Sequence, residues 1–396
     1  MTPGKSNGRR PLDGILVIDM TRIIAGPFCG LLLADLGAEV IKVEEPKGDA
    51  TRHRGPFKDG LSLHFTTHNR NKKSITLNMR SARAKEIFAE LVKVGDVVLE
   101  NFRPGVMAAM GFDFERLRAI KPDIILTSIS GFGQTGPYSQ RAAHDSIVLA
   151  QAGIQDLNGY PDMPPVRVGV NYGDYSAGLY AAFGTMTALY HRKLTGEGQW
   201  VDASLLDSSV SFLGTFFSEY IAVGTLPTRV GNANVHSAPN NTYEVKDGYV
   251  SVAAGLDSQW PSMAKAIGRP ELAEDPRYKA ARTRAQNRPE VDALVQDWLR
   301  DKTMAEAVRN LEAAGIACGP VNTLAQMVED PQVKARELIL EVEHPTVGKI
   351  PVPGQALKMS ALPKPEPKYP PLLGEHNEDV FCGLLGHRME ELAQWK

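Results

Sequence analysis

The chain has 396 residues, 43% hydrophobic and 23% charged, an ordinary composition for a folded protein long enough for two domains. Its formal net charge of −2 gives no electrostatic reason to expect nucleic acid or an anionic membrane as a partner. The three cysteines, Cys29, Cys318 and Cys382, lack metal-site spacing, so we expect no metal and a reducing, cytoplasmic location.

No segment has the pattern of a membrane anchor or a secretory signal. The longest apolar stretches are far shorter than a membrane span, and the basic residues 5–10 precede no apolar core. We therefore expect no membrane partner and interpret residues 5–10 as a disordered leader or a tag-like extension.

Strand and helix patterns alternate through the first half of the chain. Short apolar runs predict buried strands, and longer stretches with a helical period, bounded by Gly or Pro, predict helices. The predicted strands are 15–20, 40–43, 74–79, 96–100 and 123–128, and the predicted helices are 27–36 and 82–94. Strands separated by helices favour a parallel, doubly wound α/β sheet.

The second half changes character three times. A helix-rich stretch extends to about residue 226, a strand is predicted at 248–254, and charged helical stretches occupy 270–312. Residues 351–371 are Pro-rich, without a regular period. We predict a Rossmann-like large domain and a smaller α+β domain. The predicted parts are 11–227 (large domain, N-terminal part with a linker helix), 228–318 (small domain) and 319–396 (return segment completing the large domain).

The turn after the first predicted strand excludes one common use of such a sheet. A dinucleotide fingerprint needs G-x-G-x-x-G there, because only glycines let the backbone approach a pyrophosphate closely. Residues 21–27 lack that spacing, and Arg22 and Ile24 are bulky. An NAD-dependent enzyme is therefore disfavoured.

Asp174 lies in an unusual setting for a carboxylate. Gly173 precedes it, the small residues 176–178 follow it, and residues 177–190 have a helical composition. An Asp at a helix entry usually caps free backbone N–H groups. The small turn also leaves space for a ligand, so a reactive carboxylate is the alternative interpretation.

Eight segments, taken in order and at their separations, resemble the class III CoA-transferases. This is the CaiB/BaiF-like family of formyl-CoA transferase and carnitine CoA-transferase, and the α-methylacyl-CoA racemases share its fold. The segments are 11–27, 36–44, 71–75, 100–105, 130–133, 173–178, 315–321 and 371–376. The resemblance implies an interlocked, ring-like homodimer with CoA at the domain interface.

The resemblance also implies that Asp174 is the nucleophile. Its carboxylate would attack an acyl-CoA thioester to give a mixed anhydride, and the CoA thiolate would then form an aspartyl-CoA thioester. The acceptor acid would repeat these steps in reverse. We expect oxyanion donors from the backbone of residues 175–178, in a site that excludes water.

CoA, a substrate here, carries phosphates, an adenine and an apolar arm, so its groove needs cations and apolar contacts. Arg80 and Arg103 suit phosphate, Phe102 suits adenine stacking, and Lys72 and Lys73 are further phosphate candidates. By position, the resemblance assigns to CoA Arg22, Ile23, Ala25, Leu77, Met79, Arg80, Asn101, Phe102, Arg103 and Met110. Of these, Arg22, Ile23 and Ala25 would lie near the thiol end, although Arg22 is equally a candidate partner of Asp19 or Glu44.

His144 supports a rival function. The racemases carry a His at this position and would use it with Asp174 as an acid/base pair on the α-carbon of a 2-methylacyl-CoA. His144 beside Asp145 is also a common structural hydrogen-bonding pair. The sequence from Asp174 to Gly178 looks transferase-like, so we favour transfer and keep the racemase as the alternative.

The acids that exchange CoA are predicted from the residue types expected at the active site. Ile24 replaces a Gln of the formyl-CoA transferases and no polyglycine run is present, which disfavours oxalate and formate. The cations Arg22 and Arg167, with His144 and Tyr175 as substrate contacts, favour succinyl-CoA as donor and a dicarboxylate or hydroxy acid as acceptor. The pathway stays unassigned.

Overall fold

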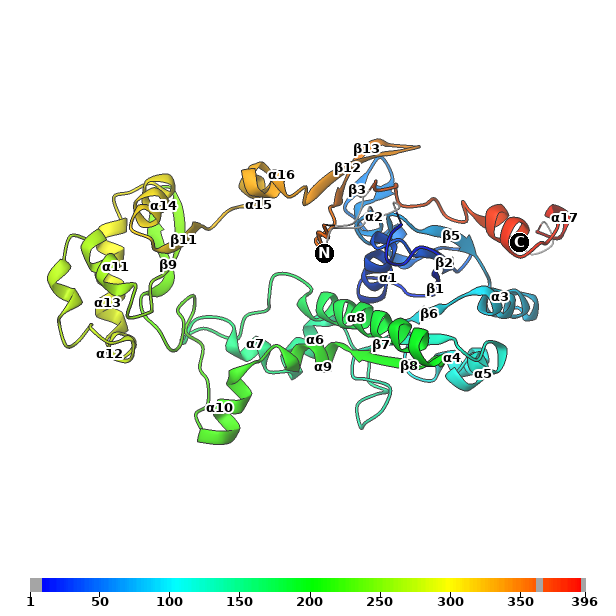
Figure 1. Cartoon of the computed structure of the whole chain (residues 1–396), viewed down its shortest axis with the longest axis horizontal. Helices are drawn as coiled ribbons and strands as arrows, with labels where there is room; N and C mark the ends of the chain where they lie inside the picture. Colours follow the sequence, from blue (N-terminus) through cyan, green and yellow to red (C-terminus); the bar gives the residue numbers. More distant parts are fainter. Residues whose placement is uncertain (1–8, 361–365, 393–396) are drawn as a thin grey trace. The chain divides into compact units, whose positions relative to one another are not determined.

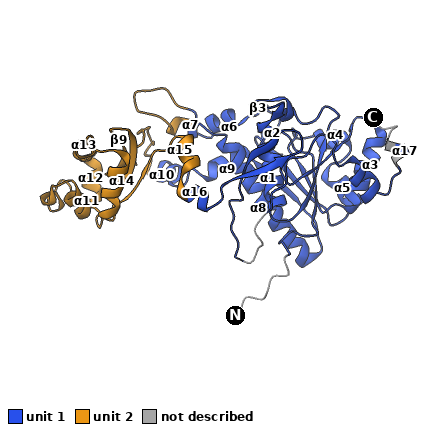
Figure 2. Ribbon diagram, turned by 90° about the horizontal axis from the view of Figure 1, so that it is seen from above, with its two compact units in different colours: residues 1–154, 167–222, 332–396 blue, residues 155–166, 223–331 orange. Residues whose placement is uncertain are grey.

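The structure is a computed structural model that describes residues 9–360 and 366–392. The predicted leader lies mostly outside the described residues. The chain divides into two compact units (Figure 2). The first comprises residues 1–154, 167–222 and 332–396, and the second comprises residues 155–166 and 223–331.

The first unit is built on a six-stranded, fully parallel sheet in the order β5-β2-β1-β6-β7-β8 (Figure 1). Its strands are β1 (Leu16–Asp19), β2 (Glu39–Glu44), β5 (Lys73–Thr76), β6 (Val97–Glu100), β7 (Ile125–Ser130) and β8 (Trp200–Ser204). The predicted parallel α/β sheet is confirmed. The edge strand β8 was not predicted, because only its last two residues are buried and it lacks a continuous apolar run.

Helices and short turns connect and follow these strands. They are α1 (Ala25–Asp35), η1 (Ala50–His53), α2 (Leu63–Asn69), α3 (Ala82–Val94), α4 (Val106–Met110), α5 (Phe114–Ile120), α6 (Asp145–Gln151), α8 (Tyr172–Thr195), α9 (Leu205–Ser211), α10 (Thr215–Val223), α16 (Pro331–Ala335), the π-helical segment η3 (Asp379–Leu384) and α17 (Met389–Leu392). The short helix α7 (Ile154–Leu157) lies mostly in the second unit. Two small hairpins complete the list of elements: β3 (Phe57–Lys58) with β4 (Leu61–Ser62), and β12 (Ile339–His344) with β13 (Gly348–Pro353).

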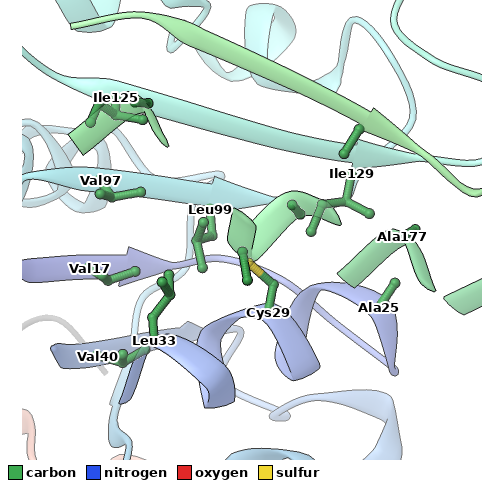
Figure 3. Close-up of a cluster of buried hydrophobic side chains, with 14 of the residues drawn as sticks. Val17, Ala25, Cys29, Leu33, Val40, Val97, Leu99, Ile125, Ile129 and Ala177 are labelled. Carbon is green, nitrogen blue, oxygen red and sulfur yellow. The ribbon is translucent and has the colours of Figure 1, made fainter. Parts of the chain in front are cut away.

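Helices cover both faces of the parallel sheet. Successive strand residues point to opposite faces, so Val17 packs with α1 and α8, whereas Ile18 packs with α3 and α5. Figure 3 shows Cys29 and Leu33 pointing from α1 toward the strands, with Ala177 of α8 in the same cluster. This packing places the start of α8 beside the start of α1.

The segment after β13 returns to the edge strand β5. The His376 N–H donates to the Ser74 carbonyl oxygen at 2.9 Å, and Asn377 Oδ1 accepts from the Thr76 N–H at 2.9 Å. The open edge of β5 is therefore covered by the chain itself, which blocks pairing with another strand there.

The second unit has its own antiparallel sheet and core. The sheet order is β11-β10-β9, and Trp260, Val250, Val291 and Leu311 are buried in its cluster. The elements are β9 (Asn240–Val245), β10 (Gly248–Ala253), α11 (Trp260–Ala266), η2 (Pro270–Ala273), α12 (Ala281–Gln286), α13 (Arg288–Leu299), α14 (Met304–Ala313), β11 (Ala317–Pro320) and α15 (Leu324–Glu329). Across the described part of both units, no helix combines the length and apolarity needed to cross a membrane.

Candidate active site

The strand order reverses direction between β1 and β6, and this is where open parallel sheets bind ligands. The loops that leave these two strands are joined by the side chain of Asn101. Its Oδ1 accepts from the Arg22 N–H and its Nδ2 donates to the Arg22 carbonyl oxygen, each at 2.8 Å. Asn101 thus holds the Arg22 backbone at the edge of the site.

A cavity of about 550 Å³, here called the switch-point cavity, opens at these strand ends. Its wall is mixed, with cationic, acidic, amide and apolar side chains, and its two acidic residues, Glu44 and Glu45, pair with Arg52 and Arg22. Six of the ten residues predicted to contact CoA line it: Arg22, Leu77, Met79, Arg80, Phe102 and Met110. Arg103 lines a separate cavity of about 210 Å³, and neither Ile23, Ala25 nor Asn101 lines the switch-point cavity. The volume and the lining suit an elongated ligand with anionic and apolar parts.

The Arg22 side chain lies over the Phe102 ring at 5.1 Å and pairs with Glu45 at 2.5 Å. The prediction that it pairs with Asp19 or Glu44 is wrong. Those two carboxylates are already engaged, Asp19 by Lys72 and Glu44 by Arg52. Arg22 therefore remains half-exposed at the cavity wall.

The prediction of Lys72 as a phosphate ligand is also wrong. Lys72 is fully buried, and its Nζ donates to Asp19 Oδ2 at 2.8 Å, to the Pro27 carbonyl oxygen at 2.8 Å and to Asn69 Oδ1 at 3.0 Å. All three ammonium protons are used inside the protein. The neighbouring Lys73 pairs with Glu39 at the surface.

Asp174 lies in the first turn of α8 and is not its N-cap. The helix begins at Tyr172 with Asn171 at the N-cap position, so the predicted N-cap role of Asp174 is wrong. A carboxylate from another helix binds the free backbone groups instead. Asp145 Oδ1 accepts from the Gly173 N–H at 2.7 Å and from the Asp174 N–H at 3.2 Å. The Asp174 carboxylate therefore does not bind the backbone N–H groups at the start of α8.

Two glycines permit the close packing around Asp174. A Cβ on Gly173 would lie 3.2 Å from Asp145 Oδ1, and a Cβ on Gly178 would lie 2.5 Å from the Ala25 carbonyl oxygen. Residues four apart share a face of a helix, so Asp174 and Gly178 both face the start of α1.

The electrostatics favour a reactive carboxylate at position 174. Asp174 is half-buried, and burial, with the nearby negative charge of Asp145, raises its pKa to about 6. The Asn171 amide opposes the shift by donating to Asp174 Oδ2 at 3.3 Å. Within the described chain Asp174 makes no ion pair. At pH 7 it is mostly ionised and lacks the neutralising partner that a structural carboxylate usually has.

The predicted oxyanion donors in residues 175–178 are not available. The Tyr175 N–H donates to the Asn171 carbonyl oxygen at 3.1 Å, and residues 176–178 lie inside α8, where helix hydrogen bonds use their N–H groups. This prediction is wrong because the helix starts five residues before the predicted run at 177.

A second cavity, about 420 Å³ in volume and here called the His68 cavity, adjoins the start of α8. Asn171 and Tyr175, on either side of Asp174 in sequence, contribute to its wall together with Ile24, His64 and His68. Of these residues, the sequence pointed to Tyr175 as a substrate contact but not to Asn171, His64 or His68. Asn171, three residues before Asp174, was detectable from helical spacing, whereas nothing in the sequence pointed to His64 or His68.

His144 is exposed at the N-cap position of α6 and makes no side-chain capping bond. The expected His144–Asp145 hydrogen-bonding pair is wrong, because the buried Asp145 carboxylate binds the N-terminus of α8 instead. Among the described residues, no cluster of His, Cys, Asp or Glu side chains has the arrangement of a metal site.

A doubly wound parallel sheet with a cavity of mixed polar and apolar lining at its switch point is a usual setting for a nucleotide-bearing substrate. The model of CoA-transferase family III matches residues 12–377. The chain belongs to this family and is a CoA-transferase.

Known CoA-transferases are similar in sequence to this chain over most of its length. The Succinyl-CoA–D-citramalate CoA-transferase of Chloroflexus aurantiacus is 38% identical over 387 residues, covering 97% of this chain and 96% of that protein. Human Succinyl-CoA:glutarate CoA-transferase is 39% identical over 381 residues, covering 96% of this chain and 87% of that protein. A crystal structure of a CAIB/BAIF family protein from Brucella suis superposes with a TM-score of 0.85 at 37% identity, covering 95% of this chain and 100% of that one.

Proposed function

We propose that this enzyme moves CoA from succinyl-CoA to a free dicarboxylate or hydroxy acid through covalent intermediates on Asp174. The observation that carries the proposal is the unpaired, half-buried Asp174 carboxylate, with a raised pKa, at the start of α8. The succinyl-CoA donor is supported by the names of two relatives, which act on succinyl-CoA with D-citramalate or glutarate.

The chemistry proceeds in four balanced steps without net proton transfer. An Asp174 oxygen attacks the thioester carbonyl carbon and the C–S bond breaks. CoA leaves as a thiolate, and a mixed anhydride of Asp174 and the donor acid is formed. The thiolate attacks the aspartyl carbonyl carbon, so the anhydride C–O bond breaks and the donor carboxylate leaves. The acceptor carboxylate then displaces the thiolate from aspartyl-CoA, and the thiolate attacks the acceptor's acyl carbon. The last C–O cleavage regenerates the Asp174 carboxylate.

Oxyanions in these steps need donors, and the start of α1 supplies the best candidates. Ile24, its N-cap residue, makes no side-chain capping bond, and a helix start leaves backbone N–H groups unpaired. The preceding residue Ile23 has φ +71°, a left-handed conformation that is costly for a β-branched side chain. We propose that this strained turn directs the first N–H groups of α1 toward the reacting carbonyl beside Asp174.

CoA is proposed to lie along the switch-point cavity. Arg80 and Lys47 line this cavity and suit the phosphates, while Phe102 and Met79 supply apolar contacts for the adenine and the arm. Arg22, Ile23 and Ala25 are assigned to the thiol end, and Asn101, Arg103 and Met110 to the groove, as the resemblance implies. Arg167, 3.5 Å from Asn171 Oδ1, is the proposed cation for the acid substrate.

We also propose that the enzyme is a homodimer. The solvent-facing side of α8 carries Leu179, Phe183, Tyr190 and Leu194, and α10 carries the exposed Ile221. Apolar rows of this extent usually mark an interface. The interlocked ring, the domain boundaries at 228 and 318, and the cytoplasmic location stay predictions.

The direct test supplies succinyl-CoA with a panel of carboxylic acids and measures acyl-CoA products by mass spectrometry. Hydroxylamine or borohydride added during turnover should label Asp174, and the Asp174→Ala variant should give neither product nor label. Deuterium uptake from heavy water into a 2-methylacyl-CoA, without any CoA exchange, would instead establish the racemase.

A further inference from the structure

Two side chains of the His68 cavity form a hydrogen-bond chain that the transfer steps do not use. His68 is 3% exposed, and its Nδ1 lies 3.1 Å from the His64 carbonyl oxygen. Its Nε2 lies 3.0 Å from the hydroxyl oxygen of Tyr175, the residue that follows the nucleophile. Both His68 and Tyr175 line the cavity.

The carbonyl partner determines where the protons lie. A carbonyl oxygen only accepts, so His68 Nδ1 carries a hydrogen and donates it to His64. Burial lowers the pKa of His68 to about 4, so the ring is neutral at pH 7 and its Nε2 has only a lone pair. The Tyr175 hydroxyl therefore donates to His68 Nε2.

This assignment leaves the Tyr175 oxygen as an acceptor. A phenol has one proton, and here His68 holds it, so only oxygen lone pairs remain for a molecule in the cavity. A substrate carboxylate also presents only lone pairs, whereas a substrate hydroxyl has a proton to donate. An acceptor left without its donor in a buried site costs affinity.

The other side chains of the cavity wall carry no acidic or basic charge. Ile24, Leu63 and Val170 are apolar, Thr67 and Asn171 are neutral and polar, and burial, together with the nearby charge of Arg54, lowers the pKa of His64. His64 is therefore also neutral at pH 7. The Tyr175 oxygen is thus a fixed acceptor in a mostly uncharged part of the site.

We propose that His68 is a positioning residue that holds the Tyr175 hydroxyl as an acceptor, so that this cavity selects acids bearing a hydroxyl over the same acids without one. The inference rests on the proposed CoA transfer at Asp174 and narrows its acceptor class to hydroxy acids. His68 acts through Tyr175 and does not touch the reacting atoms.

The test compares 2-hydroxyglutarate with glutarate, which differ by one hydroxyl, as acceptors from succinyl-CoA. The measured quantity is the ratio of their kcat/KM values. Wild type should favour the hydroxy acid about tenfold, mainly through KM, as expected for one hydrogen bond. Two variants should bring the ratio close to 1. Tyr175→Phe removes only the hydroxyl, and His68→Phe removes the ring nitrogen that holds the proton of the Tyr175 hydroxyl.

Two further variants separate positioning from packing. His68→Gln keeps an acceptor oxygen and should restore much of the ratio. His191→Phe makes the same change as His68→Phe at an exposed position about 24 Å along α8 from Tyr175, and should keep the full ratio. Thermal unfolding midpoints establish that each variant is folded.

The outcomes distinguish the two proposals. Three results would overturn the role of His68 while CoA transfer stands. They are a wild-type enzyme that uses both acids with the same kcat/KM, a His68→Phe variant with the wild-type ratio of kcat/KM values, and a folded His68→Gln variant that does not recover this ratio. Absence of exchange with every acid overturns the proposed function, and the inference falls with it.

Discussion

Two groups of acidic side chains in the first unit lie in opposite electrostatic environments. Asp19 ends β1, Glu44 ends β2 and Asp49 follows β2 in the chain. They pair with Lys72, Arg52 and Lys42 at 2.8, 2.7 and 3.0 Å, respectively. At the start of α8, Asp174 and Asp145 lie close together, and neither pairs with a cation among the described residues.

The pKa directions follow from this difference. Burial alone would raise the pKa of Asp19, but Lys72 and Lys42 outweigh it and lower the value. For Asp174, burial and Asp145 act together and raise the pKa to about 6. Complete pairing marks a structural group, and an uncompensated carboxylate at an accessible helix start marks a reactive one.

The largest expected effect comes from removing the unpaired carboxylate. Asp174→Asn should lower kcat by about 10⁴-fold or more, because the covalent route is lost. It should also raise the free energy of unfolding at pH 7 by about 1–2 kcal/mol, because a disfavoured charge disappears. Steady-state kinetics and chemical denaturation measure both. A variant that is less stable than wild type would contradict the electrostatic difference between the two groups.

Removing a cation from the paired group should affect stability instead. Lys72→Met should lower the free energy of unfolding by about 3–5 kcal/mol, because it leaves Asp19 buried without a partner. The adjacent Lys73→Met is the control and should cost less than about 1 kcal/mol, since its pair with Glu39 is solvent-exposed. Similar losses in the two variants would refute the assignment of a structural role to Lys72.

The two groups should respond to acid in different pH ranges. Asp174 attacks only when ionised, so kcat/KM for acyl-CoA should fall about tenfold per pH unit below pH 6. The paired carboxylates have lowered pKa values, so their contribution to stability is present above about pH 4 and is lost below it. Between pH 5 and 6 the enzyme should lose activity while remaining folded, which rate and circular-dichroism measurements check.

The smallest expected effects are shifts of the acid limb, which is the part of the pH profile where kcat/KM falls below pH 6. Asp145→Asn keeps an oxygen for the Gly173 and Asp174 N–H groups but removes the negative charge, so the limb should move to lower pH. Asn171→Ala removes a donor to the Asp174 carboxylate and should move the limb to higher pH. Shifts in the same direction in both variants would show that Asp174 is not the titrating group.

Sequence patterns predicted the parallel sheet because its strands are short apolar runs bounded by helices, and they failed at β8, where burial is limited to two residues. The family resemblance pointed to Asp174 as the candidate nucleophile, and six of the ten residues that it assigned to CoA line the switch-point cavity. It did not predict that Asp145, rather than Asp174, binds the N-terminus of α8. Lys72, a reasonable phosphate ligand by residue type, is buried because its partner lies on β1.

The sequence alone indicated the alternation of strands and helices in the first half of the chain, the family and the candidate nucleophile Asp174, because each depends on local periodicity or on a contiguous motif. Only the tertiary structure decided which charges are neutralised. Lys72 and Asp19 are 53 residues apart, Asp145 and Gly173 are 28 apart, and His68 and Tyr175 are 107 apart. Hydrogen bonds act over about 3 Å, so the path of the folded chain determines which carboxylate stays available for chemistry.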